Sequence, residues 1–542
     1  MRSYAAPYED VWGPRRGRIV AAALALVFVV IVGRAAYVSF NGPDRSAVPV
    51  AKAEVARRAD IVDRKGELLA TTITGKSLAV DPSAVWESRD VVAAIRSVFP
   101  ELGEDALTAM MADRKRQFVW VKRGLTDDQA KALKATGVEG LMFVEEPQRV
   151  YPNGRLAGHF LGYTGVDGEG LEGIERIYDA RLKLGGSALK LSLDASVQFV
   201  LEEELDRAFA DFDMKGAAGI VVDANTGEVR AIASWPFMDP RQRGDQSDEA
   251  KTNRALNSRM ELGSIYKPLT VAAALEAGVL QPTDRFDVSK PIKIGAVTVK
   301  DAHPLEHASS VSVTDILAYS SNIGSAEIAQ RMGPQTQRVF LGKVGLLTGL
   351  KQDGPQWATP LLPARWDQTA LATVAYGHGI SVSPMAFAMT YLPFANGGEY
   401  VTPTFVEPLN AETVKRTRVM SAQTAASVLG MLRTTVTTGS GKNADAKGYE
   451  VAGKTGTAEK PGPNGYDADR NITSFAAIFP ASRPQYVVLV VLDEAQPRTG
   501  VNRTAAFTSA TIAGKVIARA APLLDVRPVL EVAATKSVVE AQ

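Results

Sequence analysis

The sequence predicts an α+β protein: one antiparallel sheet with packed helices, preceded by a membrane anchor and an irregular α+β domain. Three observations predict this class. Residues 19–33 are an uninterrupted apolar run. Residues 218–224 and 228–234 are apolar segments on either side of a turn sequence, which is a hairpin signal. Two further apolar segments, 473–479 and 486–492, come late in the chain, and helical patterns lie between, so both ends of this domain are expected to form one sheet.

The first element is the anchor, residues 19–40, which is interrupted only by Arg34 and is long enough to cross a bilayer. A cleaved signal peptide is the alternative. We favour the anchor because Arg34 stands at the −3 position before Tyr37, where a cleavage site needs a small residue. Arg15, Arg16 and Arg18 precede the run, so residues 1–18 are expected to be a cytoplasmic tail. The prediction is a single-pass protein of the bacterial inner membrane, with its folded bulk in the periplasm.

The next two elements are folded domains. Residues 41–187 mix short strand-like pieces with turns and a glycine-dense stretch at 162–173, which is typical of an irregular α+β pedestal. The texture changes near 188, where 197–212 has apolar residues at helical spacing. We therefore expect a second domain over 188–525, and a tail over 526–542 that has no strong pattern.

Composition excludes several classes of function. The formal net charge is +1 and no basic run stands out, which argues against nucleic acid as a partner. Without cysteine there is no thiolate catalysis and no Cys-based zinc site. His303, Glu306 and His307 fit the zinc pattern H-x-x-E-H, but Pro304 and the strand-to-loop context argue against the helix that such a site needs. We predict neither a metal nor a cofactor.

A phosphate-loop pattern, G-x-x-x-x-G-K-[ST], occurs at 448–455. A true phosphate loop joins a buried strand to the start of a helix. Here both flanks are polar and rich in glycine or proline, and ATP is absent outside the cytoplasm. We therefore expect Lys454 to belong to another kind of site.

A Ser-Lys pair in the second domain suggests that site. Ser264 and Lys267 are three residues apart, so they share one side of a helix. Pro268 is tolerated only in the first turn of a helix, so the helix is expected to begin close to Ser264. A serine becomes a nucleophile when a base takes its proton, and a lysine can be that base if burial and a second cation lower its pKa. Lys454 is a candidate for the second cation.

Two further motifs complete a pattern. Ser320 and Asn322 form S-x-N after a short helical stretch, and Lys454, Thr455 and Gly456 form K-T-G at the start of an expected strand. Each motif is common by chance. Together and in the order S-x-x-K, S-x-N, K-T-G they are the set found in class A β-lactamases and penicillin-binding proteins.

Beyond these motifs the chain resembles class B penicillin-binding proteins. The resemblance includes "RADIVDRKGELLA" at 58–70, "GHFLGYTGVDGEGLEGIERIYDARL" at 158–182, "VVDANTGEVRAIAS" at 221–234 and "YGHGISVSP" at 376–384, and it covers about 58–500. No glycosyltransferase domain separates the anchor from the pedestal, as in class B. The stretch "GKTGTAEKP" at 453–461 is more similar to the septal, FtsI-type branch than to the elongation branch.

The resemblance implies a peptidoglycan D,D-transpeptidase. Ser264 would attack the bond between the two terminal D-alanines of a stem peptide, with Lys267 as the base. Ser320 would relay a proton to the leaving amine, and the Asn322 amide would hold Lys267 and the substrate backbone. The product of this step is an acyl-enzyme, which an amine of a neighbouring stem would resolve as a cross-link.

The third motif is implied to bind substrate. Lys454 and Thr455 would hold the terminal carboxylate, and Gly456 and Thr457 would line the same strand. The backbone N–H groups of Ser264 and Thr457 would form the oxyanion hole. β-Lactams would act as inhibitors by trapping Ser264, and the anchor and pedestal would dock the SEDS-family septal glycan polymerase and other divisome proteins.

Alternatives stay open on the sequence. An elongation-type class B protein shares all three motifs. A D,D-carboxypeptidase or β-lactamase would use the same site, but Glu407 in "EPLN" does not complete the deacylation pattern E-x-x-L-N. A divisome scaffold with a vestigial site would keep the pedestal and the anchor without catalysis.

Overall fold

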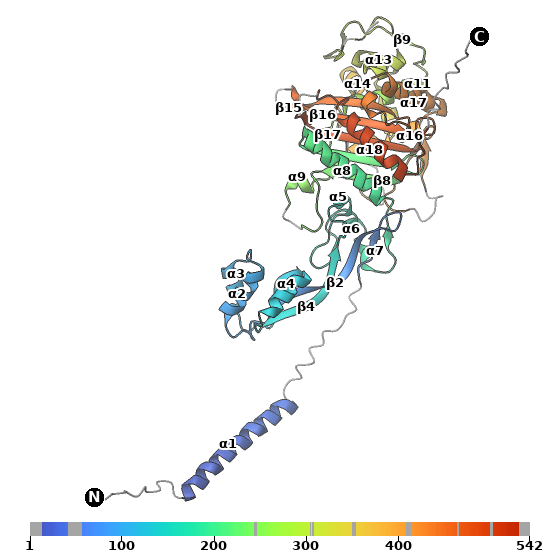
Figure 1. Cartoon of the computed structure of the whole chain (residues 1–542). Helices are drawn as coiled ribbons and strands as arrows, with labels where there is room; N and C mark the ends of the chain where they lie inside the picture. The colour runs from blue at the N-terminus through green and yellow to red at the C-terminus, as the bar shows by residue number, and fades with distance from the viewer. Residues whose placement is uncertain are drawn as a thin grey trace, which may run out of the picture. The chain divides into compact units, whose positions relative to one another are not determined.

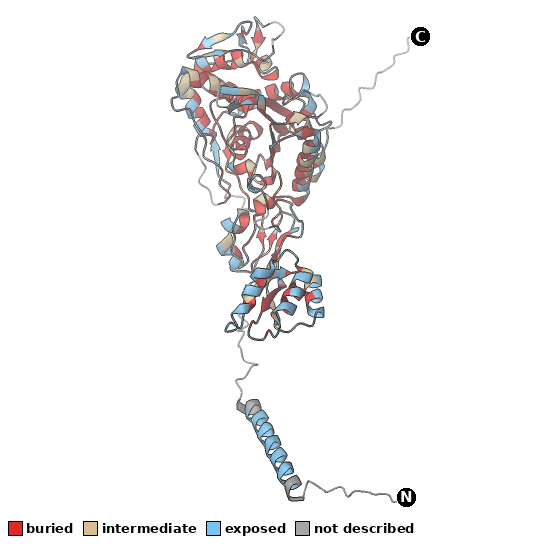
Figure 2. Ribbon diagram, turned by 90° about the vertical axis from the view of Figure 1, so that its left-hand side faces the viewer, coloured by how far each residue is buried: buried red, intermediate tan, exposed pale blue. Residues whose placement is uncertain are grey.

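The computed structural model describes residues 14–41, 57–242, 246–303, 305, 308–348, 354–407, 414–462, 465–498 and 502–529. The chain divides into two units, Met1–Ala56 and Arg57–Gln542. Within the first unit lies helix α1 (Pro14–Asn41) (Figure 1). Its segment Arg18–Tyr37 has a mean hydropathy of 2.6 and is long and apolar enough to cross a membrane. The described side chains of α1 are exposed, as Figure 2 shows. This helix falls where the anchor was expected.

The second unit begins with the pedestal, a name used below for residues 57–187. Its long strand β2 (Leu68–Val80) pairs antiparallel with β3 (Val119–Leu125) and with β4 (Leu141–Val150). Helices α2 (Ser88–Val98), α3 (Glu104–Ala112) and α4 (Asp127–Ala135) cover one face of this sheet. They form a small core because the apolar side of each helix meets alternate residues of the strands, such as Leu78 and Val80.

Short elements connect the pedestal to the rest of the unit. They are α5 (Gly158–Leu161), α6 (Gly173–Ile177) and α7 (Asp179–Lys183). Strand β5 (Leu189–Lys190) pairs parallel with β1 (Ile61–Val62), so a strand after residue 188 pairs with a strand of the pedestal. The boundary expected there stays a prediction.

A buried ionic cluster fixes these connections. It consists of Arg58, Arg149, Glu175 and Asp179. The Glu175 carboxylate is fully buried and accepts from Arg58 Nε at 2.6 Å and from Arg149 Nε at 2.7 Å. Arg58 also reaches Asp179 at 2.7 Å. The pedestal strands and helix α6 are therefore tied together by paired charges.

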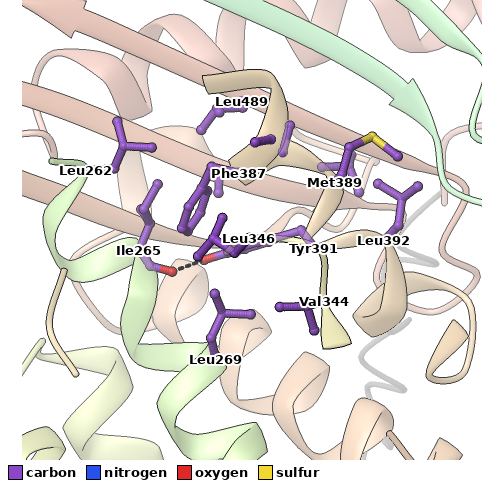
Figure 3. Packing of buried hydrophobic residues seen from close by; sticks show 14 of the residues in the cluster. Leu262, Ile265, Leu269, Val344, Leu346, Phe387, Met389, Tyr391, Leu392 and Leu489 are labelled. Atoms are coloured by element: carbon purple, nitrogen blue, oxygen red, sulfur yellow. Dashed lines mark hydrogen bonds between the residues drawn. The ribbon is translucent and has the colours of Figure 1, made fainter. Parts of the chain in front are cut away.

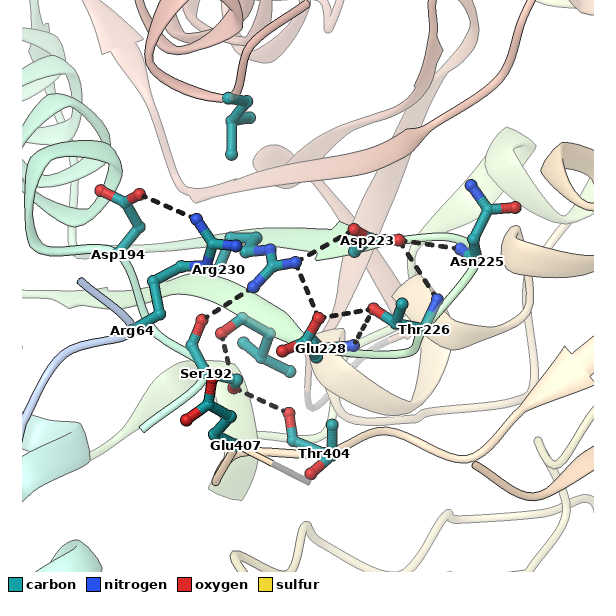
Figure 4. A network of polar contacts seen from close by, with 12 residues as sticks. Arg64, Ser192, Asp194, Asp223, Asn225, Thr226, Glu228, Arg230, Thr404 and Glu407 are labelled. Carbon is teal, nitrogen blue, oxygen red and sulfur yellow. Dashed lines mark hydrogen bonds and ion pairs between the residues drawn. The ribbon is translucent and has the colours of Figure 1, made fainter. Parts of the chain in front are cut away.

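A second polar network lies where the pedestal meets the hairpin of residues 216–235 (Figure 4). Arg230 is buried and donates to Asp223 at 3.1 Å and to Glu228 at 2.7 Å, at the turn of a hairpin. It also donates to the Ser192 carbonyl at 3.4 Å. Glu407 belongs to this region, because its carboxylate pairs with Lys190 at 3.0 Å. Glu407 is thus an exposed ion-pair partner.

The main sheet is the five-stranded antiparallel sheet that the sequence predicts. Its order is β15-β16-β17-β7-β8. The strands are β15 (Ala452–Gly462), β16 (Gly465–Phe479), β17 (Tyr486–Asp493), β7 (Gly216–Asp223) and β8 (Val229–Trp235). The early hairpin and the late strands meet because β17 pairs with β7 over its whole length. Strand β15 is an edge strand, with its outer side free of any other strand of this sheet.

Helices cover both faces of the main sheet. Helices α8 (Ala195–Asp211) and α18 (Ser509–Leu523) pack on one face, where Ala217 and Val221 point. Residues Ala218 and Ile220 point to the other face, as expected from the strand period of two. The helices there are α10 (Arg254–Asn257), α11 (Lys267–Glu276), α12 (Val313–Ala318), α13 (Asn322–Lys343), α14 (Gln368–Val374), α15 (Pro384–Met389), α16 (Leu392–Ala395) and α17 (Ala422–Thr437).

The remaining elements are short. They are β6 (Phe212–Asp213), α9 (Asp248–Lys251), η1 (Gly263–Tyr266), β9 (Arg285–Phe286), β10 (Ile292–Ile294), β11 (Val297–Val299), β12 (Val311–Ser312), β13 (Glu399–Val401), β14 (Arg416–Arg418), η3 (Lys442–Ala444) and β18 (Gln496–Pro497). Of the expected carboxyl-terminal tail, the residues from 530 onward lie outside the described part of the chain.

Candidate active site

The predicted nucleophile lies on a 3-10 turn. Turn η1 (Gly263–Tyr266) carries Ser264, and α11 begins at Lys267 with Pro268 in its first turn. The prediction placed the start of the helix close to Ser264, and the α-helix proper begins three residues later. Residues three apart eclipse each other in a 3-10 turn, so Ser264 and Lys267 still share one side. Ser264 is half-buried and Lys267 is fully buried.

Close packing on β15 holds this turn. Gly263 has φ +63°, and a Cβ at this position would lie 2.8 Å from the Thr457 carbonyl oxygen and 3.3 Å from its amide nitrogen. The residue before Ser264 therefore contacts the backbone of Thr457 and must be a glycine. This places the two predicted oxyanion-hole residues, Ser264 and Thr457, on adjoining segments.

The turn rests on an apolar floor (Figure 3). Leu262, Ile265 and Leu269 are completely buried there, against Phe387 and Leu392. The Tyr391 hydroxyl, also buried, donates to the Ile265 carbonyl at 2.8 Å. Since the floor is closely packed and the backbone of the turn is hydrogen-bonded, the predicted nucleophile is held on a rigid support.

The second motif meets Lys267. Ser320 follows α12 and adopts a left-handed conformation, with φ +67°, which is uncommon for a residue with a Cβ. In this conformation both its carbonyl and its hydroxyl oxygen accept from Lys267 Nζ, the hydroxyl at 3.0 Å. The first two motifs are therefore in direct contact.

Asn322 does not reach Lys267. Its side-chain Nδ2 donates to the carbonyl of Lys300 at 3.1 Å. Across the described ranges, the hydrogen bonds of Lys267 Nζ go to Ser320 alone. The amide that was expected to hold Lys267 instead fastens the loop before α12.

Asp301, which sequence reasoning missed, organises the start of α13. Its carboxylate accepts from the Asn322 N–H at 2.5 Å, from the Ile323 N–H at 3.0 Å and from the Ser321 hydroxyl at 2.7 Å. These bonds fix the residues that directly follow Ser320. The sequence offers no signal for Asp301, because it lies 19 positions before Ser320 in a strand-to-loop stretch.

The third motif lies on the edge strand β15. Lys454 is fully buried, and its Nζ donates to the Thr455 carbonyl at 3.0 Å and to the Thr455 hydroxyl at 3.4 Å. A Cβ on Gly456 would lie 2.3 Å from the Leu262 carbonyl oxygen, so this strand contacts the nucleophile segment directly. Thr457 is exposed, and its hydroxyl accepts from the Ala505 N–H at 3.2 Å.

The two buried lysines both have lowered pKa values, and Lys454 acts on Lys267. Burial lowers the pKa of Lys454 to about 7. Burial and the charge of Lys454 lower the pKa of Lys267 well below its ordinary value, and the Asp301 carboxylate acts in the opposite direction. A lysine with a lowered pKa is neutral for more of the time and can accept a proton. Lys267 therefore has the environment of a general base.

Further polar residues adjoin the site without having been predicted. Tyr466 on β16 donates to the Glu261 carboxylate at 3.0 Å, and the Gly379 N–H donates to the same carboxylate at 3.1 Å. The His378 ring lies 5.4 Å from the Tyr466 ring, and burial followed by the charge of Lys267 lowers the pKa of His378 to about 4. The sequence contained "YGHGISVSP" as a landmark, but nothing in it assigned His378 to the surroundings of Lys267.

The rejected zinc pattern can be followed only in part. His303 is exposed, whereas Glu306 and His307 lie outside the described residues. The three motifs bring together hydroxyls, buried amines and backbone amides on the turn of Ser264, on the Ser320 segment and on β15. This arrangement suits acyl transfer through a serine ester.

Comparisons with known proteins agree with this chemistry. Residues 217–518 match the penicillin-binding protein transpeptidase domain, and residues 53–198 match the penicillin-binding protein dimerisation domain. A probable peptidoglycan D,D-transpeptidase FtsI of Caulobacter vibrioides is 37% identical over 487 residues, covering 87% of this chain and 82% of that protein. Peptidoglycan D,D-transpeptidase FtsI of Escherichia coli K12 is 29% identical over 518 residues, covering 87% of this chain and 86% of the relative.

Solved structures agree as well. Penicillin-binding protein 3 of Mycobacterium tuberculosis in complex with ampicillin has a TM-score of 0.69 and 27% identity, covering 88% of this chain and 97% of that one. Its complex with aztreonam has a TM-score of 0.68. The chain belongs to the penicillin-binding proteins with a transpeptidase domain, and within them it is a class B member of the FtsI type.

Proposed function

We propose that this protein is a peptidoglycan D,D-transpeptidase that cross-links stem peptides in septal wall synthesis through an acyl-enzyme on Ser264. The observation that carries the proposal is the position of Lys267. It is fully buried, its amine touches the Ser320 hydroxyl at 3.0 Å, and it lies one 3-10 turn after Ser264. A buried amine that hydrogen-bonds one hydroxyl and follows a serine by one turn serves proton transfer to and from that serine better than it serves structure.

The first half-reaction forms the ester. Neutral Lys267 takes the proton of Ser264 as the Ser264 Oγ bonds to the carbonyl carbon between the two terminal D-alanines of the donor. The C–N bond then breaks, and the proton passes from Lys267 through the Ser320 hydroxyl to the leaving nitrogen, which departs as free D-Ala. The negative oxygen formed in between is stabilised by the backbone N–H groups of Ser264 and Thr457.

The second half-reaction forms the cross-link. The amine of a neighbouring stem attacks the ester carbon, loses its proton to the same relay, and releases Ser264 Oγ with its proton restored. Before that, in the first half-reaction, Lys454 and Thr455 hold the donor's terminal carboxylate, which leaves with D-Ala, while Gly456 and Thr457 keep the donor along the open edge of β15. The Asn322 amide, at the start of α13, would also contact the substrate backbone.

The cellular setting is also a proposal. We place the protein in the inner membrane with α1 as its single span, residues before it in the cytoplasm and the transpeptidase domain in the periplasm. The arginines before the span support this orientation. The FtsI-type relationship supports a septal duty, with the SEDS-family glycan polymerase and other divisome proteins as partners of the anchor and pedestal.

The test uses the full-length protein in detergent. Wild type, Ser264→Ala and the exposed control Ser289→Ala are incubated with a fluorescent penicillin and then, separately, with a pentapeptide donor and an amine acceptor. We expect a lasting adduct and a cross-linked product in wild type and Ser289→Ala, and neither in Ser264→Ala. Release of D-Ala without cross-link would establish a carboxypeptidase instead, and rapid loss of the penicillin adduct would establish a β-lactamase. A folded wild type that takes no label would support the scaffold alternative.

A further inference from the structure

Ser440 lies between the second and third motifs and belongs to neither. It sits on the loop after α17, and its hydroxyl is 2.8 Å from the hydroxyl of Thr455. Its backbone is fixed independently of this contact, because the Ser440 N–H donates to the Ala318 carbonyl at 3.0 Å. Ala318 ends α12, two residues before Ser320. The loop thus connects the segment that carries Ser320 to the strand that carries Lys454.

Backbone contacts on both sides of Ser440 fix the course of this loop. A Cβ on the preceding Gly439 would lie 2.3 Å from the Ala318 carbonyl oxygen, so the two segments touch through backbone atoms. On the other side, the Gly441 N–H donates to the Thr435 carbonyl at 3.0 Å. Ser440 is half-buried, and the backbone on either side of it is held against α12 and α17.

The contact with Ser440 limits the direction in which the Thr455 hydroxyl can donate its proton. A hydroxyl has one proton to donate and two lone pairs that accept. Lys454 Nζ already donates to the Thr455 hydroxyl oxygen at 3.4 Å. If the Ser440 hydroxyl donates as well, both lone pairs of Thr455 are occupied. The single Thr455 proton must then point away from both donors, toward the open edge of β15.

We propose that Ser440 is a positioning residue for the donor's terminal carboxylate, which it serves by directing the Thr455 proton into the substrate groove. This rests on the proposed function, in which Lys454 and Thr455 hold that carboxylate. A hydroxyl that is already hydrogen-bonded as an acceptor is a stronger donor, because hydrogen bonds in a chain polarise one another. Ser440 therefore contributes to selection of a donor that ends in a carboxylate, although it does not touch the reacting atoms.

The test separates recognition of the carboxylate from general damage. Wild type, Ser440→Ala and Ser440→Thr are compared in the full-length protein with two thioester donors, one ending in a free carboxylate and the other in the corresponding amide. For each we measure the kcat and KM of acylation. We expect Ser440→Ala to lose about tenfold in kcat/KM with the carboxylate donor, mostly through KM, and to change little with the amide donor. Ser440→Thr, which retains the hydroxyl, should restore the preference.

A double variant gives a second measurement. Thr455→Val removes the hydroxyl that Ser440 acts on, so adding Ser440→Ala to it should cause no further loss with the carboxylate donor. Equal losses with both donors, or additive losses in the double variant, would overturn the proposal in favour of a purely structural role. If wild type accepts neither donor and no penicillin, the proposed function itself fails. If wild type turns over both donors and Ser440→Ala matches it, the function stands and this inference alone is wrong.

Discussion

The protein buries charge in two places and treats it differently in each. In the pedestal, two arginines meet the carboxylates of Glu175 and Asp179 at 2.6 to 2.7 Å. In the active site, Lys267 and Lys454 are buried as completely, yet neither forms an ion pair among the described residues. Their hydrogen bonds go to hydroxyls and carbonyls instead.

The difference shows what each cluster is for. A buried cation next to a carboxylate stays charged and holds segments together, because separating the pair would expose an uncompensated charge. A buried amine without a carboxylate is unstable as a cation, so its pKa falls and it exchanges protons. Buried charge therefore links segments in the pedestal, whereas it yields a lysine of lowered pKa in the proposed active site. Which of the two results depends on whether a carboxylate pairs with the cation.

The largest expected effect comes from breaking the buried ion pairs of Glu175 in the pedestal. Glu175→Gln leaves Arg58 and Arg149 buried without their shared carboxylate, and we expect the pedestal to lose about 3–5 kcal/mol of unfolding free energy. Chemical denaturation followed by intrinsic fluorescence measures it. The neighbouring exposed Glu172→Gln is the matched control, with an expected change within about 0.5 kcal/mol. Equal stability of the two variants would show that the pedestal does not depend on paired charge.

In the proposed active site, by contrast, we expect the removal of a buried cation to increase the stability of the protein. Lys454→Met removes a cation whose pKa falls from an ordinary value near 10.4 in the unfolded chain to about 7 in the folded one. The unfolded chain therefore binds a proton that the folded protein gives up, so wild-type stability rises with pH between about 7 and 10. The variant should be more stable than wild type by a few kcal/mol at pH 7, and its stability should rise less over that window.

Lys460, on the same strand, is the matched control for this experiment. Its Nζ pairs with Asp493 at 2.8 Å and with Glu494 at 2.7 Å, and these partners raise its pKa. Lys460→Met should therefore destabilise the protein. If Lys454→Met is destabilising as well, the distinction between the cation without a carboxylate and the paired cation is lost at this strand.

Much of this arrangement is predictable from the sequence, because it is local. The hairpin of β7 and β8, the apolar strands β16 and β17 and helices α8 and α18 follow from residue periodicity. The residues within each motif lie one to three positions apart, and Pro268 restricts where the helix after Ser264 begins. The membrane segment is likewise visible as a single apolar run.

What could not be predicted depends on contacts between distant segments. Asp301 and Ser440 reach the site only because α12, α13 and α17 pack against one another, and no local pattern marks either residue. The left-handed backbone of Ser320 is set by bonds on both of its sides. The 3-10 turn at Ser264 and the regular sheet and helices of the pedestal, which looked irregular in the sequence, also depend on tertiary packing.

The smallest expected effect tests Asp301, a carboxylate that acts on the pKa of Lys267. Asp301 raises the pKa of Lys267 without forming an ion pair with it, while Lys454 and burial lower it, and His378 faces the same lysine with its own pKa lowered to about 4. Asp301→Asn keeps an oxygen for the N–H groups of Asn322 and Ile323 but removes the negative charge, so the pKa of Lys267 should fall further. Lys267 must be neutral to take the serine proton, so acylation should begin to rise at a lower pH.

We expect the rising limb of the penicillin acylation rate to move down by at most about one pH unit in Asp301→Asn. Stopped-flow acylation from pH 5 to 9 measures it, with the exposed Asp287→Asn as the control that should leave the limb in place. Asp301→Ala removes the acceptor as well, and should lower the rate at every pH in addition to the shift. A lower rate with an unmoved limb in Asp301→Asn would mean that Asp301 acts on the backbone after Ser320 alone. The pKa of Lys267 would then be set by burial and Lys454, without an opposing effect of Asp301.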